Sequence, residues 1–213
     1  MEMMSEVDMQ RWSQFKEGDR EAFAAIYQQH ILQLITYGLK LCPDQDLLKD
    51  QIQELFVELW HSRKNLAPAR SVKFYLFKAL RYKLVRLEKN RYLSPQSARI
   101  ALSFDNPLEE PIETSIIERE SRASQVASLR QAMKSLSLRQ QEAIQLRYYQ
   151  GFTHDQIAEL MDLNYQSVSN LLHRALTRLK EVFKTPVFPM LPPVLLAVSP
   201  VFQAVLSKIF SIS

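Results

Sequence analysis

The stretch GFTHDQIAELMDLNYQSVSNLLHRALTRLK, residues 151–180, predicts two helices joined by a tight turn. Thr153 and Gln156 have the spacing of a capping box, which marks the start of the first helix. The turn follows at 162–164, and Asn164 is a suitable N-cap for the second helix because its short side chain can accept from a free amide. Apolar residues then recur at spacings of three and four along 168–179, so we expect one face of the second helix to be buried.

The other face of the second helix is polar and cationic. A short helix, a three-residue turn and a second helix with such a face have the layout of a DNA-reading helix-turn-helix; a helical hairpin buried in a core is the alternative. Glutamine and asparagine can pair with adenine edges, whereas arginine suits phosphates. The expected base contacts are Gln166, Ser167, Ser169, Asn170 and His173, and the expected phosphate contacts are Arg174 and Arg178.

The composition favours a mostly helical protein of the cytoplasm. The 213 residues are 46% apolar, enough for one large domain or two small ones, and include only three glycines. Cys42 is the single cysteine, so no intramolecular disulfide can form and a reducing compartment is expected. The N-terminus is acidic and lacks the apolar core of a secretory signal.

Charge alternates along the chain. Residues 1–60 carry 5 basic and 11 acidic side chains, and residues 61–92 carry 10 basic side chains and a single acid, Glu88. Residues 93–120 carry 2 basic and 6 acidic side chains, and residues 121–184 carry 9 and 5. This alternation predicts two segments that face nucleic acid, separated by segments that avoid or imitate it.

Apolar spacing predicts further helices in the N-terminal half, over 9–40 with a break at Gly18-Asp19, over 45–62 and over 71–91. The last of these helices carries many cations that we do not expect to face a core, with two tyrosines among them. Cations bind phosphates and aromatic rings stack on exposed bases, so the mixture suits single-stranded or melting DNA. A solvated basic helix face explains it equally well. The cations are Lys73, Lys78, Arg81, Lys83, Arg86 and Lys89, and the tyrosines are Tyr75 and Tyr82.

The remaining segments predict a linker and a tail. Three prolines and no sustained apolar stripe over 93–120 indicate a linker. Helical patterns resume at about 121–134 and continue over 137–148, where Ser137 and Gln140 form a second capping box. The stretch 185–207 has no charged residue and reaches the length of a membrane span, but its prolines would break a spanning helix. A docking or partner-binding tail and a membrane contact both stay open.

Motifs for catalysis are missing from the sequence. It has no Gly-rich phosphate loop, HExxH, CxxC or GxSxG, and its four histidines are scattered. We therefore expect no enzyme, no cofactor, no metal site and no small-molecule substrate.

Two blocks of sequence resemble a known family. The first comprises FKEGDREAFAAIYQQH (15–30) and DQIQELFVELW (50–60), and the second is SLSLRQQEAIQLRYYQGFTHDQIAELMDLNYQSVSNLLHRALTRLK (135–180), in which HRALTRL matches especially well. Both are similar to the extracytoplasmic function (ECF) group of the bacterial sigma-70 family. The resemblance implies an all-α fold of two small helical domains joined by a flexible linker, the second a helix-turn-helix (winged-helix-like) domain.

The resemblance also implies a division of labour. Region 2 (8–92) would bind RNA polymerase core and recognise and melt the −10 element, an acidic linker (93–121) would follow, and region 4 (122–184) would read the −35 element, before an apolar, Pro-rich tail (185–213). The implied polymerase contacts are Asp50, Gln53, Glu54, Phe56 and Trp60. The implied −10 contacts are Lys64, Asn65, Arg70, Lys73, Tyr75, Lys78, Arg81 and Tyr82. Promoter DNA and an anti-sigma factor, often membrane-anchored in this family, are the other implied partners.

The chain departs from the family pattern in its recognition motif. The turn has Asp162 where the family usually has glycine, and Ser169-Asn170-Leu171 replaces a frequent Lys-Ser-Arg. The loss of two cations leaves phosphate binding to Arg174 and Arg178. We therefore expect weak affinity for isolated DNA and useful binding only when polymerase holds both domains on the promoter.

Two other functions are compatible with the residues alone. The chain could be a stand-alone helix-turn-helix regulator that binds duplex DNA without polymerase. It could also be an adaptor whose apolar tail is its main binding surface. An assay for promoter-dependent initiation with core polymerase distinguishes a sigma factor from both of these alternatives.

Overall fold

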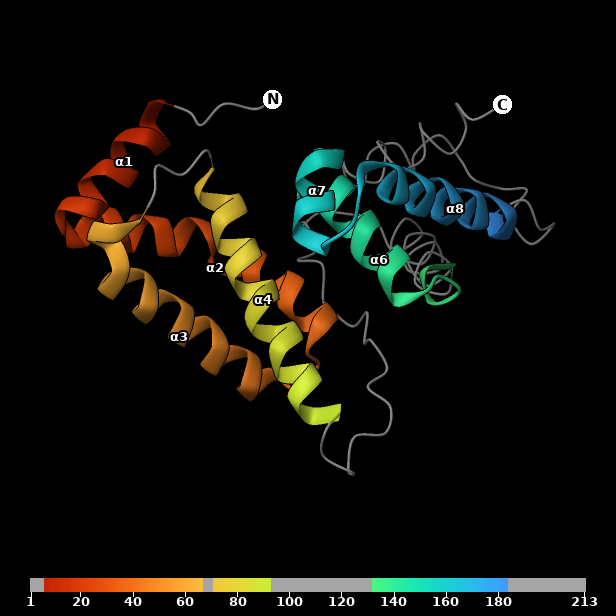
Figure 1. The fold of residues 1–213 in the computed structure, drawn as a ribbon, viewed down its shortest axis with the longest axis horizontal. Helices are drawn as coiled ribbons and strands as arrows, with labels where there is room; N and C mark the ends of the chain where they lie inside the picture. The colour runs from red at the N-terminus through yellow and green to blue at the C-terminus, as the bar shows by residue number, and fades with distance from the viewer. Residues whose placement is uncertain (1–5, 67–70, 93–131, 184–213) are drawn as a thin grey trace, which may run out of the picture. The chain divides into compact units, whose positions relative to one another are not determined.

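The computed structural model describes residues 6–66, 71–92 and 132–183, and within these ranges the chain forms helices and no strand (Figure 1). The chain divides into two compact units, Met1–Asn106 and Pro107–Ser213. The expected linker, most of the expected helix over 121–134, the tail and Arg70 lie outside the described residues. None of the described helices has the length and apolarity needed to cross a membrane.

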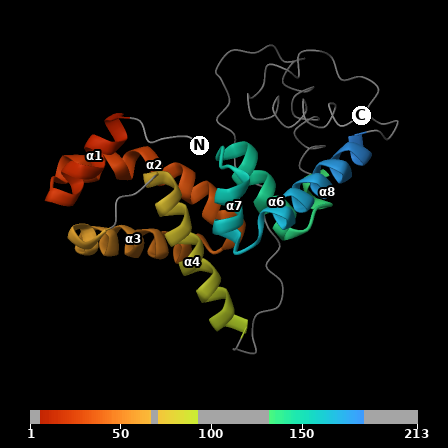
Figure 2. The ribbon, with the colours of Figure 1, turned by 45° about the horizontal axis from the view of Figure 1, so that its top comes forward.

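The described part of the first unit consists of four α-helices, which are α1 (Glu6–Glu17), α2 (Arg20–Leu41), α3 (Gln45–Ser62) and α4 (Val72–Tyr92). A 3-10 turn, η1 (Arg63–Asn65), follows α3. Helix α2 packs against the three others, and α4 also packs against α3, as Figures 1 and 2 show. The helices expected from apolar spacing are therefore confirmed, with ends within a few residues of those predicted.

Local sequence explains where these helices begin. Gly18 has φ +100°, a conformation that interrupts the chain between α1 and α2 because most residues avoid it. Asp19 then caps α2 by accepting from the amides of Glu21 and Ala22. Asp44 caps α3 by accepting from the amide of Leu47 at 3.1 Å.

The core of the first unit lies between α2 and its three neighbours. Its fully buried large side chains include Phe15 from α1, Tyr37 from α2, Leu59 from α3 and Phe77 from α4. The rings of Tyr37 and Phe77 lie 5.0 Å apart, so α2 and α4 meet through aromatic packing.

One basic residue of α4 lies where the sequence did not predict it. Lys83 was expected on the outer cationic face, but only 14% of its side chain is exposed. It lies against α3 and forms ion pairs with Glu54 and Glu58. The flexible stem of lysine can cross apolar surface to reach a carboxylate on a neighbouring helix, which periodicity along α4 does not reveal.

The second unit contains α6 (Leu138–Ile144), the π-helical segment η2 (Gln145–Tyr149), α7 (His154–Met161) and α8 (Tyr165–Phe183). Helix α8 packs against α6 and α7. Ser137 and Gln140 form the expected capping box at the start of α6, with bonds of 3.3 and 2.9 Å. Buried Ile144, Ile157 and Val168 contribute to one small core.

Gly38 allows α2 and α3 to approach closely. A Cβ atom at this position would collide with the side chain of Leu48, which is 1% exposed and has little room to move. We predict that Gly38→Ala lowers the free energy of unfolding of the first unit by about 1–2 kcal/mol, because overpacking outweighs the gain in helix propensity. Urea unfolding followed by tryptophan fluorescence measures this, since both tryptophans, Trp12 and Trp60, belong to this unit.

The same substitution in a Leu48→Ala background provides the control. With the obstructing side chain removed, Gly38→Ala should be neutral or stabilising by up to about 1 kcal/mol. A loss of stability of the same size in both backgrounds would contradict the proposed collision.

Candidate nucleic-acid and protein interfaces

The helix-turn-helix predicted from the sequence is present in the second unit. Thr153 accepts from the amide of Gln156 at 3.3 Å, and the Gln156 side chain accepts from the amide of Thr153 at 2.9 Å. Asp162 ends α7 in the left-handed conformation, with φ 55° and ψ 53°. Asn164 accepts from the amide of Ser167 at 2.7 Å, as expected of an N-cap. These caps fix the direction in which α8 leaves the turn.

The outer face of α8 presents most of the residues expected to contact DNA. Gln166, Asn170, His173, Arg174 and Arg178 are exposed. Ser167 and Ser169 are half-buried, which leaves them less reach into a groove of DNA.

Two side-chain bonds organise this face. The amide of Gln166 donates to Asn170 at 3.1 Å, so the two amides form a pair one turn apart. Arg178 bonds to Glu181 at 3.3 Å, so part of its charge is neutralised within the helix. A shallow cleft of about 460 Å³ collects His173, Arg174 and Arg178 beside Gln140. The structure therefore brings the two expected phosphate contacts together.

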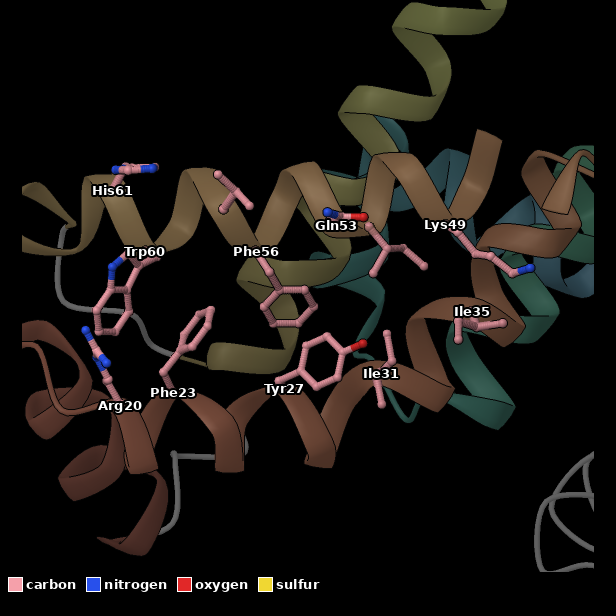
Figure 3. A pocket seen from close by; sticks show the side chains of 12 residues that line it. Arg20, Phe23, Tyr27, Ile31, Ile35, Lys49, Gln53, Phe56, Trp60 and His61 are labelled. Carbon is pink, nitrogen blue, oxygen red and sulfur yellow. The ribbon is translucent and has the colours of Figure 1, made fainter. Parts of the chain in front are cut away.

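An apolar groove lies between α2 and α3 in the first unit (Figure 3). Its volume is about 700 Å³, and its lining is mostly aromatic and aliphatic. The rings of Tyr27 and Phe56 lie 4.8 Å apart and those of Phe23 and Trp60 lie 5.1 Å apart, so aromatic pairs line the groove. Figure 3 shows Arg20 beside Trp60 at one end of the groove, and Lys49 at the other.

The residues expected to bind polymerase have different positions relative to this groove. Gln53, Phe56 and Trp60 line it. Asp50 and Glu54 are exposed on α3 but do not line the groove. Phe56 is only 4% exposed, so it forms part of the core as well as the wall.

Sequence reasoning missed the contribution of α2 to the groove. Tyr27 is 41% exposed, and it lines the groove together with Ile31 and Ile35. Val57 from α3 is 48% exposed beside them. The sequence did contain a signal, because α2 has apolar residues on two sides and only one side can face the core. The packing of α2 decides which of these sides stays partly uncovered.

The residues expected to contact −10 DNA extend from η1 along α4. Lys64, Asn65, Lys78 and Tyr82 are exposed, and the ring of Tyr82 is well placed to stack because 67% of this residue is accessible. The half-buried members are Lys73, Tyr75 and Arg81.

Tyr75 belongs partly to the core of the first unit. Its ring centroid lies 5.9 Å from that of Trp12. Burial, and then the negative charge of Glu58, raise the pKa of the Tyr75 phenol, so this group stays neutral and can only donate or accept hydrogen bonds. Its stacking surface is smaller than that of Tyr82.

The start of the loop after α3 is anchored to α1. Lys16 donates to the carbonyl oxygen of Leu66 at 2.7 Å. The guanidinium of Arg63 lies 4.4 Å from the ring centroid of Trp60 and donates to the Trp60 carbonyl oxygen at 2.7 Å. The described end of this loop is therefore held by cations from two elements. Among the described residues, no three His, Cys, Asp or Glu side chains are grouped closely enough to hold a metal ion.

Comparison with known proteins agrees with this geometry. Residues 127–179 match the family model described as "Sigma-70, region 4". An ECF RNA polymerase sigma factor, SigK of Mycobacterium sp. (strain KMS), is 25% identical over 169 residues, which cover 78% of this chain and 86% of the relative. These matches support a relationship to the ECF group of the sigma-70 family, to which both blocks of the sequence are similar.

Two further comparisons give similar results. RNA polymerase sigma factor YlaC of Bacillus subtilis (strain 168) is 22% identical over 174 residues, covering 76% of this chain and 92% of YlaC. The solved structure of CnrH in complex with the cytosolic domain of CnrY has a TM-score of 0.55 at 20% identity, covering 84% of this chain and 97% of the other.

The solved structure of the sigma factor RpoE from Bartonella quintana in complex with the anti-sigma factor NepR also has a TM-score of 0.55. It is 19% identical and covers 75% of this chain and 96% of RpoE. These structural likenesses support the fold. The expected all-α fold with two helical domains and a helix-turn-helix in the second is confirmed.

Asp162 adopts a backbone conformation that glycine adopts more easily. We predict that Asp162→Gly stabilises the helix-turn-helix by about 0.5–1 kcal/mol, because the left-handed conformation then carries no Cβ penalty. Hydrogen exchange of the α8 amides in the full-length chain measures the stability of this unit.

Asp162→Ala is the matched control, and it should destabilise the unit because alanine lacks the short polar side chain that tolerates this conformation. If glycine and alanine shifted the exchange of α8 in the same direction, the backbone conformation would not be the cause.

Proposed function

We propose that this chain is an ECF-type sigma factor that binds RNA polymerase core and directs promoter-specific initiation through the −10 and −35 elements. The observation that carries the proposal is the presence, on one chain, of an exposed polar recognition helix and a separate unit with an apolar groove beside an acidic helix face. A stand-alone regulator needs only the first of these surfaces, so we do not favour that alternative.

Polymerase docking is assigned to α3 and the groove that α3 shares with α2. Trp60 and Phe56 supply apolar contact, and aromatic anchors of this kind often carry most of the energy of an interface. Asp50, Gln53 and Glu54 lie on the exposed part of the same helix, where acidic groups steer a cationic partner and set its register.

Recognition of the −10 element is assigned to η1, the loop after it and α4. A base that leaves the duplex has lost its stacking, at a cost of a few kcal/mol that a pocket must offset. Tyr82 offers an exposed ring, and Lys64 and Lys78 offer exposed cations near the path of the strand. Asn65, Arg70, Lys73, Tyr75 and Arg81 complete the proposed set.

Recognition of the −35 element is assigned to α8. The Gln166–Asn170 pair presents amide donors and acceptors of the kind that read base edges in the major groove. Ser167, Ser169 and His173 flank this pair, and Arg174 and Arg178 bind the phosphates. Because one of these two cations is already partly neutralised by Glu181, the affinity of α8 for isolated DNA should be low.

The domain boundaries and partners follow from this assignment. We propose region 2 at 8–92, an acidic linker at 93–121 and region 4 at 122–184, with a separate apolar tail at 185–213. An anti-sigma factor that covers these surfaces is the proposed regulator, by analogy with the relatives solved with CnrY and NepR. The site of action is the cytoplasm, where the core polymerase is, and we assign the chain no catalytic activity.

Base contacts and phosphate contacts on α8 should respond differently to substitution. We predict that Asn170→Ala lowers the discrimination between a cognate and a mutated −35 element by about 1–3 kcal/mol, because a base-edge contact is lost. Arg178→Ala should weaken binding equally on both DNAs and reduce the salt dependence by about one ion. Both are measured as promoter affinities of the holoenzyme at several salt concentrations; equal effects of the two substitutions on discrimination would contradict the division.

Polymerase docking should depend on the acids of α3. We predict that Asp50→Lys combined with Glu54→Lys abolishes co-purification with core polymerase, because charge reversal turns attraction into repulsion at a complementary surface. Asp46→Lys is the control. It changes an acid in the first turn of the same helix that pairs locally with Lys49 at 3.4 Å and is not one of the five residues proposed to contact polymerase, so binding should persist. Unchanged binding of the double variant would refute the docking assignment.

A further inference from the structure

The Lys83 side chain reaches from α4 to the acidic face of α3. Its ammonium nitrogen lies 3.2 Å from a carboxylate oxygen of Glu54 and 2.8 Å from one of Glu58. Only 14% of the lysine side chain is exposed, whereas 54% and 59% of the two glutamate side chains are. The cation is therefore the enclosed member of the cluster, and the carboxylates face the solvent.

The cluster keeps the lysine charged. Burial by itself lowers the pKa of Lys83, but hydrogen bonds and charges from Glu58 and Glu54 outweigh burial and raise the pKa. Glu54 and Glu58 lie one turn apart on α3, where two like charges repel each other. Lys83 relieves that repulsion and holds both carboxylates over the junction between α3 and α4.

The position of Glu54 connects this cluster to docking. Glu54 is one of the residues proposed to bind polymerase, so a cation beneath it acts in two opposing ways. It removes one unit of negative charge from the face that attracts the partner. It also fixes the direction of a long side chain whose free rotamers would otherwise have to be ordered on binding, at a cost in side-chain entropy.

We propose that Lys83 is a positioning residue for polymerase docking, which holds Glu54 in its binding orientation and fastens the docking helix α3 to the DNA-contacting helix α4. This inference rests on the function proposed above. It adds Lys83 to the residues that act in polymerase docking, whereas the sequence pattern grouped Lys83 with the cations suited to DNA. Lys83 acts through Glu54 and not through its own contact with polymerase or DNA.

Lys83 has two effects on docking, because it reduces the negative charge of α3 and it orients Glu54. Removing its charge would change the affinity for polymerase in opposite directions through these two effects. If the negative charge of α3 alone governed docking, Lys83→Met would tighten the complex, because the face would become more acidic. If the orientation of Glu54 governs docking, Lys83→Met weakens it. We expect the affinity of the full-length chain for core polymerase, measured by equilibrium binding without DNA, to fall about three- to tenfold, in the range of a partly exposed ion pair.

Matched variants distinguish an effect of Glu54 orientation from an effect of net charge. Arg86→Met removes the same charge from the exposed face of α4 without touching the acids of α3 and should not weaken docking. Lys83→Arg keeps the cation and should restore affinity to within about twofold. In a Glu54→Gln background, Lys83→Met should add no further loss, because the side chain through which it acts is already neutral.

Several outcomes would overturn the proposal. One such outcome is that Lys83→Met and Arg86→Met change the affinity for core polymerase equally. Another is that Lys83→Met tightens binding. A third is that Lys83→Met lowers the affinity as much in the Glu54→Gln background as in the unaltered chain. Thermal melting followed by tryptophan fluorescence shows whether the first unit is folded; if the Met variant melts below the assay temperature, the affinities of all variants are compared at a lower temperature at which each is folded. Failure of the unaltered chain to bind core polymerase would refute the proposed function itself, and this inference with it.

Discussion

Helix α2 must bury apolar side chains against three neighbouring helices at once, and the rest of the first unit depends on how it does so. Its residues Ile26, Leu34 and Tyr37 are almost fully enclosed. Further apolar residues on the same helix, including Tyr27 and Ile31, cannot enter that core and lie instead along the edge shared with α3. The groove is therefore a consequence of a helix that has more apolar surface than the other described helices of this unit cover.

The second unit depends on the direction of one helix. The capping box at Thr153, the left-handed Asp162 and the Asn164 cap together set how α7 leads into α8. Because these local bonds fix the recognition helix in the free chain, little ordering is needed when DNA binds. Under the proposed function, the few cations on α8 would make this unit a reader of bases more than an electrostatic anchor, to be delivered to DNA by a second contact.

Intramolecular ion pairs reduce the charge that some helix faces can present to a partner. The sequence shows an acidic α3 and a basic α4, and counting residues suggests one surface for polymerase and one for DNA. In the structure, Lys83 crosses from one to the other and neutralises part of the acidic face, while Glu181 offsets Arg178. Which charges reach a partner depends on the geometry between helices, so periodicity along a single helix does not determine how much charge each face presents.

Local patterns in the amino-acid sequence were enough to predict the helices, their caps and the helix-turn-helix, because capping boxes and 3-4 spacing act between residues a few positions apart. The same spacing predicted the polar face of α8, whereas the docking role of α3 is what the resemblance of two blocks to one family implies. The packing of α2 against α3 decided that Phe56 is mostly core and that Tyr27 lines a groove, and the packing of α4 against α3 decided that Lys83 faces Glu54. These are contacts between residues about 29 positions apart in the chain, and only the three-dimensional packing of the helices determines them.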